Sequence, residues 1–196
     1  MKDPGPYRWR ECLVLAAVPL SVSLGWITAQ FDLTQWLGDR WYLAWGVGAY
    51  YAVTVLALLA WYRSLSVPRT LSAIILSILA WHWAVQLASD GYQGGPSENG
   101  FVPRSVVAGF FGAVIVGISP LAGRDFPRWE RRLAILGLVG AVCGAQMALL
   151  CLWNFAIGFW LGLIGWQLAV TAVLIYSSAP QRNGQPVFWP SPPQLG

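Results

Sequence analysis

The segment "RLAILGLVGAVCGAQMALLCLWNFAIGFWLGLIGWQLAVTAVLIYS", residues 132–177, contains two long apolar runs, 132–152 and 155–177. A hydrocarbon core of about 30 Å requires about 20 helical residues, and each run has that length. The runs are continuously apolar rather than alternating, and backbone groups must be paired in lipid, so they predict transmembrane helices and exclude a barrel. Because the connection "LWN" is very short, the two helices should form an antiparallel hairpin.

Four further apolar stretches of spanning length precede this hairpin. They cover residues 12–30, 41–62, 68–89 and 103–122. The 196-residue chain is 57% hydrophobic and only 10% charged, whereas soluble domains carry about 25% charged residues. We therefore predict an all-α integral membrane protein. Its single domain, residues 1–178, would be a six-transmembrane-helix bundle, and residues 179–196 would form an extended, proline-rich tail.

The basic residues fall almost entirely on one side of the predicted bundle. Of the twelve, only Arg40 and Arg104 lie on the other side. Basic residues are enriched in cytoplasmic loops, so both termini and the tail are predicted to be cytoplasmic. Only Lys2 among them is a lysine, which is typical of a GC-rich bacterial genome and favours a bacterial inner membrane. In a rival interpretation, the first stretch is a signal peptide cleaved after Ala29.

Small residues recur every four positions in the last three predicted helices. They are Gly109, Ala113 and Gly117, then Gly140, Gly144 and Ala148, then Gly158 and Gly162. Such faces let helix backbones approach closely. Two interpretations remain open: packing among the helices of this chain, and docking against helices of a partner.

Four polar side chains fall in the cores of the predicted spans: His82, Gln86, Gln146 and Gln167. His82 and Gln86 are four residues apart and share a helix face. Counting along the helices places His82 and Gln146 at similar depth, in the outer half. An unpaired imidazole or amide is costly in hydrocarbon, so each group needs a partner. We predict that, together with Trp83, they line a ligand site; interhelical hydrogen bonds are the alternative.

The glycine-rich segment 89–100 lies just above this candidate site, and His82 is the only histidine in the chain. A neutral imidazole could ligate the metal of a tetrapyrrole at one axial position. The sequence therefore predicts at most one kind of cofactor, a tetrapyrrole or another pigment held through His82. No protein-bound metal site is predicted, because Cys12, Cys143 and Cys151 form no CxxC motif and no second histidine is present.

The sequence lacks the residues on which several kinds of protein chemistry depend. No acidic or basic residue lies in the middle of a predicted span, which counts against an ion-coupled pump. No Gly-x-Ser-x-Gly motif or P-loop is present, and His82 has no nearby intramembrane carboxylate, so we do not predict an enzyme. The basic residues are not clustered with exposed aromatic residues, so nucleic acid is not a predicted partner.

These features lead to three hypotheses about function. The first is a non-catalytic integral subunit of a larger membrane complex, which binds a small ligand or pigment in the outer half of the bundle. The second is a small-solute transporter or channel component, and the third is a membrane enzyme with a site at the inner rim. The predicted partners are the lipid bilayer and either other membrane subunits or further copies of the chain.

Overall fold

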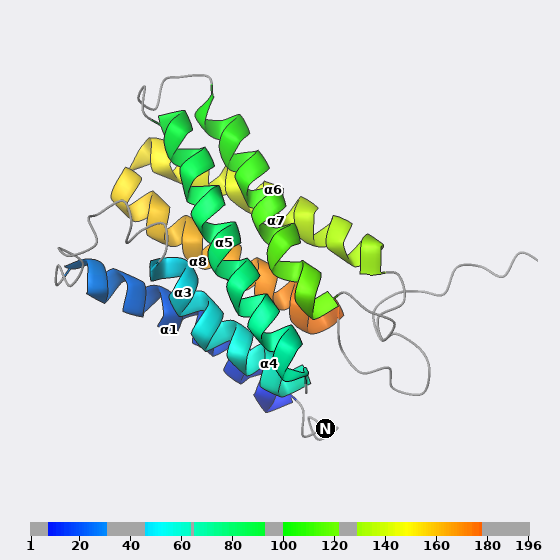
Figure 1. The fold of residues 1–196 in the computed structure, drawn as a ribbon. Helices are drawn as coiled ribbons and strands as arrows, with labels where there is room; N and C mark the ends of the chain where they lie inside the picture. Colours follow the sequence, from blue (N-terminus) through cyan, green and yellow to red (C-terminus); the bar gives the residue numbers. More distant parts are fainter. Residues whose placement is uncertain (1–7, 31–45, 64, 93–99, 122–128, 178–196) are drawn as a thin grey trace, which may run out of the picture.

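The computed structural model describes residues 8–30, 46–63, 65–92, 100–121 and 129–177, and nearly all of them are helical (Figure 1). In chain order the elements are α1 (Arg8–Gln30), α3 (Val47–Tyr51), η2 (Ala52–Leu56), α4 (Ala57–Arg63), α5 (Val67–Tyr92), α6 (Phe101–Leu121), α7 (Trp129–Trp153) and α8 (Phe155–Ser177). The predicted tail 179–196 and most of the segment 89–100 lie outside the described residues.

Five helices within the described ranges are long and apolar enough to cross a membrane, namely α1, α5, α6, α7 and α8. A sixth apolar segment, Val47–Tyr62, is shorter. Residues 41–45 of the predicted second span lie outside the described part of the chain. The described part of the chain is thus an almost entirely helical bundle of apolar helices, as predicted, while the orientation of the termini stays a prediction.

The helices form a closed ring in chain order. The α3–η2–α4 segment packs between α1 and α5, α6 lies between α5 and α7, and α8 closes the ring by packing against both α7 and α1. Figure 1 shows α5 and α6 side by side in front, with α7 and α8 passing behind them. The interior of the ring therefore receives side chains from every part of the chain.

The α6 and α7 helices approach each other backbone to backbone. A Cβ atom built on Gly109 would overlap the carbonyl group of Gly140, and one on Gly140 would overlap the carbonyl group of Gly109. A Cβ atom on Gly144 would overlap the carbonyl group of Ser105. We call this contact of Ser105, Gly109, Gly140 and Gly144 the glycine seam. Only residues without a side chain permit such close approach.

The remaining small residues of the predicted faces also lie at contacts within the chain. A Cβ atom on Gly158 would overlap the backbone of Leu150, where α8 meets α7. A Cβ atom on Gly162 would overlap Met147, and one on Gly117 would overlap the side chain of Leu136. The structure therefore uses these glycines to pack α6, α7 and α8 of one chain together.

The α7–α8 connection consists of one non-helical residue, Asn154. Its side-chain Oδ1 accepts a hydrogen bond of 3.1 Å from the backbone N–H of Ile157, which caps the start of α8. Its own N–H donates to the carbonyl of Leu150 at 3.0 Å, so it also completes the last turn of α7. The antiparallel hairpin predicted from the short "LWN" connection is confirmed.

One half of the ring interior is filled with aliphatic side chains. This half lies toward the start of α1 and the end of α8, where Val14, Val18, Leu59, Leu136 and Leu174 are all almost completely buried. These side chains form the aliphatic part of the core.

The second apolar segment differs from the continuous α-helix predicted for it. Residues Ala52–Leu56 form a π-helical turn, η2, between α3 and α4. Within it, the hydroxyl of Thr54 donates a 2.6 Å hydrogen bond to the carbonyl of Tyr50, four residues earlier. A side-chain donor at this carbonyl competes with the regular α-helical bond, and π-helical turns are wider than α-helical ones. The turn begins directly after Tyr51, whose side chain points into the ring.

Candidate functional site

A pocket of about 640 Å³ occupies the other half of the ring, between α3, α5, α6, α7 and α8. Its shallow end is lined by Ala88, Phe101, Cys151 and Phe155, which lie near the ends of their helices at the α5–α6 and α7–α8 connections. From there the pocket extends toward the middle of the bundle. The aliphatic half of the ring lies beyond it.

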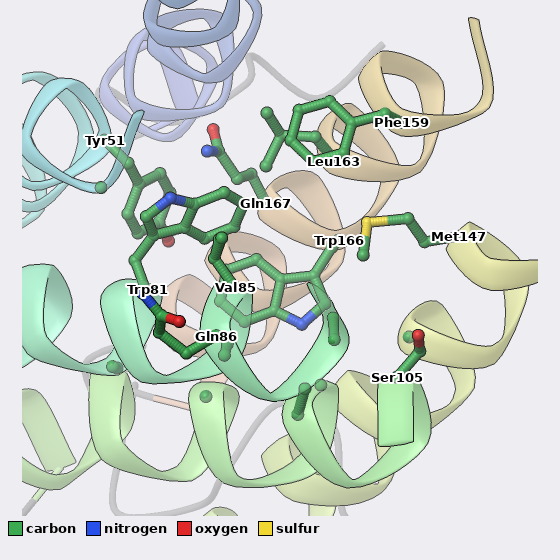
Figure 2. A pocket seen from close by; sticks show the side chains of 18 of the residues that line it. Tyr51, Trp81, Val85, Gln86, Ser105, Met147, Phe159, Leu163, Trp166 and Gln167 are labelled. Atoms are coloured by element: carbon green, nitrogen blue, oxygen red, sulfur yellow. The ribbon is translucent and has the colours of Figure 1, made fainter. Parts of the chain in front are cut away.

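The deep end of the pocket is an aromatic wall with one amide group. The ring centroids of Trp81 and Trp166 are 6.3 Å apart at an interplanar angle of 58°. Those of Tyr51 and Trp166 are 6.4 Å apart at 60°. Figure 2 shows that these three rings and the side chain of Gln167 surround the same space, although they come from α3, α5 and α8. We call Tyr51, Trp81, Trp166 and Gln167 the deep cluster.

Two hydrogen bonds to neighbouring helices hold side chains of the deep cluster in place. The hydroxyl of Ser21 on α1 lies 2.8 Å from Oε1 of Gln167 and donates to it. The hydroxyls of Tyr51 and Thr171 are 2.9 Å apart and form a second bond, from α3 to α8. All four of these side chains are almost fully buried. The position of the wall is therefore set by polar contacts that cross the ring.

Ser105 contributes a polar group on the opposite side of the pocket. It is only 1% exposed, it lines the pocket, and its Oγ has no hydrogen-bond partner among the described residues. Figure 2 shows its hydroxyl on α6, on the side of Met147. A buried hydroxyl without a partner is costly, so a ligand oxygen or nitrogen at this position would be favoured.

Among the described residues, the pocket lining carries no formal charge. These residues include no aspartate, glutamate, lysine, arginine or histidine, and their polar side chains are hydroxyls, amides, indole groups and a thiol. In the described part of the chain, no three histidine, cysteine, aspartate or glutamate side chains gather where they could hold a metal ion. A lining of this kind suits an uncharged and largely apolar molecule, because a buried charge would find no counter-charge.

The structure brings together two of the five side chains predicted for a ligand site. Gln167 lines the deep end, and Gln86, which is exposed, lines the pocket from α5. His82, Trp83 and Gln146 are not among the lining residues. That any of the five binds a ligand stays a prediction.

Most lining residues of α5 follow one face of the helix, while Val85 and Gln86 line the pocket from outside that face. The lining residues Ser77, Trp81, Ala84 and Ala88 follow steps of three and four along one face of that helix. His82 is one residue beyond that face, about 100° around the helix, and it lies partly buried beside the pocket rather than in it. Trp83 is rotated farther, and its ring packs edge-on against Phe111 at 5.9 Å on the outside of the bundle.

The same rule applies on α7. The lining residues Gly144, Met147 and Cys151 again follow steps of three and four. Gln146 lies two residues beyond Gly144, about 200° away around the helix, and is exposed. Counting residues along a helix predicts the depth of a side chain but not the direction in which it points.

Sequence reasoning missed Ser105, Tyr51 and Trp166 as lining residues. A usable signal existed for Ser105, because it stands four residues before Gly109 and so shares the small-residue face of α6. No comparable signal marks Tyr51 or Trp166, since aromatic residues are frequent throughout this chain.

Comparison of the chain with protein-family models, curated proteins and solved structures finds no match. The chemistry of the pocket is therefore the sole guide to the function of the site.

Proposed function

We propose that this protein is a non-catalytic membrane protein that binds a small, uncharged, mainly apolar molecule in the pocket of the ring. The observation that carries the proposal is the pocket itself. A space of about 640 Å³ has the size of a ligand site, and it is walled by aromatic and aliphatic side chains with a few placed polar groups. Lipid-embedded binding sites for neutral molecules need this combination.

The shape of the pocket favours a binding protein over a channel. Most lining residues of α5, α6, α7 and α8 belong to the halves of those helices that adjoin the α5–α6 and α7–α8 connections, while Ser77, Gly112, Val116 and Gln167 lie beyond the helix midpoints. The other half of the ring is filled by the aliphatic core. A passive pore needs a path along the whole bundle, whereas a receptor or carrier subunit needs only a pocket that is accessible from one end or from the lipid.

We also propose that the protein works as a subunit of a larger membrane assembly in a bacterial inner membrane. Support for this part comes from the absence of catalytic and ion-coupling residues in the sequence, which leaves further chemistry to partners. The glycines at helix contacts give no support to it, because they are used within the chain.

In the proposed orientation, both termini are cytoplasmic and the shallow end of the pocket faces the outer side. The asymmetry of basic residues supports this orientation. Reporter fusions after residue 196 test it: a cytoplasm-active reporter should give a strong signal and a periplasm-active reporter a weak one. The reverse result would overturn the orientation without affecting the pocket.

Ligand binding can be tested with a substitution that fills the pocket. Gly112 lines the pocket, and a Cβ atom there would meet only Trp166 and Ala84, at 3.6 and 3.7 Å, which is ordinary contact. Gly112→Leu should therefore extend into the cavity and leave the helix contacts intact. Gly165→Leu is the matched control, because a Cβ atom at Gly165 has nothing within 4 Å.

The measurement is mass spectrometry of small molecules extracted from each protein after purification in mild detergent from native membranes. We expect an uncharged molecule in near-stoichiometric amount with wild type and Gly165→Leu, and its loss from Gly112→Leu. Gel filtration must show that all three proteins are folded and of equal size. If wild type and Gly112→Leu carry the same molecules in the same amounts, the pocket is not a binding site and the proposal fails.

A further inference from the structure

We propose that the ligand is a neutral, ring-bearing lipid. Its flat ring, which carries carbonyl or hydroxyl groups, lies at the deep cluster, and its hydrocarbon tail extends toward the shallow end. Isoprenoid quinones are membrane molecules with this chemistry. The inference rests on the proposed function and adds the chemical class of the molecule that the pocket holds.

The first argument is the shape of the deep end. Tyr51, Trp81 and Trp166 present rings that are tilted by about 60° to one another rather than stacked together. The rings contact one another at the deep end of the pocket that they line, where Tyr51 is 2% and Trp166 8% exposed. Aromatic rings prefer offset or edge-to-face contact with another ring, and a flat ligand ring can make such contacts with two walls at once.

The second argument is the amide of Gln167. It is 1% exposed, and Ser21 supplies its hydrogen bond at Oε1. A glutamine amide has two N–H donors and two acceptor lone pairs, so it retains hydrogen-bonding capacity toward the pocket that it lines. A ring carbonyl or hydroxyl would use that capacity. The end of a saturated acyl chain would instead cover the amide with hydrocarbon, which costs free energy.

The third argument is the path from the deep cluster to the shallow end. Along α8 the lining runs from Phe155 to Gln167, which corresponds to about 18 Å at a rise of 1.5 Å per residue. Phe159, Leu163 and Met147 line this path with apolar surface. Ser105 interrupts it with a single hydroxyl, which favours a ligand that carries more than one oxygen. A ring alone would leave much of the path empty.

Binding of decylubiquinone, a ring with a short saturated tail, tests the inference. We expect it to raise the thermal unfolding midpoint of the purified, ligand-stripped protein in mild detergent, in a saturable way, because a ligand that binds the folded state stabilises it. Dodecanol, an uncharged chain with one hydroxyl and no ring, should have little effect at the same concentrations. Gly112→Leu should lose the response to decylubiquinone.

Two glutamine substitutions test whether the side-chain amide of Gln167 contributes to ligand binding. Gln167→Leu should weaken decylubiquinone binding about tenfold, the effect of one lost hydrogen bond in a desolvated site. Gln146→Leu makes the same chemical change on an exposed position outside the pocket and should bind as wild type does. Ser21→Ala removes the bond that holds this amide but leaves the amide in place, so it should weaken binding less than Gln167→Leu does.

Two results would overturn the inference while the proposed function stands. One is equal stabilisation by dodecanol and decylubiquinone, with both lost in Gly112→Leu, which would make the pocket a site for acyl chains. The other is a co-purified molecule without a ring that depends on Gly112. If no co-purified molecule is lost from Gly112→Leu, the proposed function itself is wrong.

Discussion

The glycine seam and the pocket are neighbours on α6, yet they are built in opposite ways. Gly109 faces the backbone of Gly140, where no Cβ atom fits, while Gly112, three residues later, faces open space bordered by Trp166 and Ala84. Lipid offers no hydrophobic drive for helices to associate, so close contact depends on small residues that let the backbones meet. Where large aromatic rings line the interior instead, the helices stay farther apart and leave a cavity.

This comparison assigns different roles to residues of the same type. Gly109 is required at the seam because two backbones occupy the space, although it also borders the pocket, whereas Gly112 leaves room for a ligand. Both kinds lie within the small-residue face of α6, and a stability measurement should separate them. The following changes are ordered from the largest expected effect to the smallest.

Gly109→Leu should prevent formation of a stable bundle. Overpacking a core costs about 1–3 kcal/mol when side chains can move aside, but at this position the obstacle is backbone, so we expect a loss above about 4 kcal/mol. Gel filtration and SDS-induced unfolding in mixed micelles measure the effect, with Gly165→Leu as the control. A Gly109→Leu protein as stable as the control would break the distinction between seam and pocket.

Trp166→Ala tests the aromatic wall. Removal of a buried tryptophan costs about 3–5 kcal/mol in soluble cores, and we expect the lower part of that range, because one side of this ring already borders the pocket. SDS-induced unfolding should show the loss. Trp153→Ala, at a side chain that is 76% exposed, should change stability little. Equal effects of the two substitutions would mean that the wall does not support the ring of helices.

Asn154→Ala tests the end of the α7–α8 hairpin. Loss of the side-chain cap should cost about 1 kcal/mol, the usual effect at the start of a helix. Asn154→Asp keeps an oxygen acceptor at this position and should retain most of the stability. The unfolding midpoint of each variant gives the comparison, and an alanine variant indistinguishable from the aspartate variant would show that the cap is dispensable.

Ser21→Ala should have the smallest effect on stability, about 0.6 kcal/mol, which is the average for a hydrogen bond between membrane helices. The loss is small because the unfolded chain in a membrane also finds partners for its polar groups. A cost of several kcal/mol would instead mean that this bond determines how α1 and α8 meet. SDS-induced unfolding again provides the measurement.

The sequence by itself determined the class and much of the architecture. The lengths of its apolar runs fix the helices, since lipid leaves a backbone no other way to pair its polar groups. The three residues "LWN" fix the antiparallel neighbours α7 and α8, because so short a connection cannot reach any other arrangement. The recurrence of small residues indicated correctly that α6, α7 and α8 have faces suited to close contact.

The tertiary structure alone decided which of these faces meet and where space remains. The sequence could not choose between contacts within the chain and contacts with a partner, because a glycine face fits either. It also could not bring Tyr51, Trp81 and Gln167 together, since their proximity depends on closure of the ring between α1 and α8. Counting residues gives the depth of a side chain, but the rotation of each helix about its own axis is set by its neighbours. For that reason Gln167 lines the pocket, while Gln146 and His82 do not.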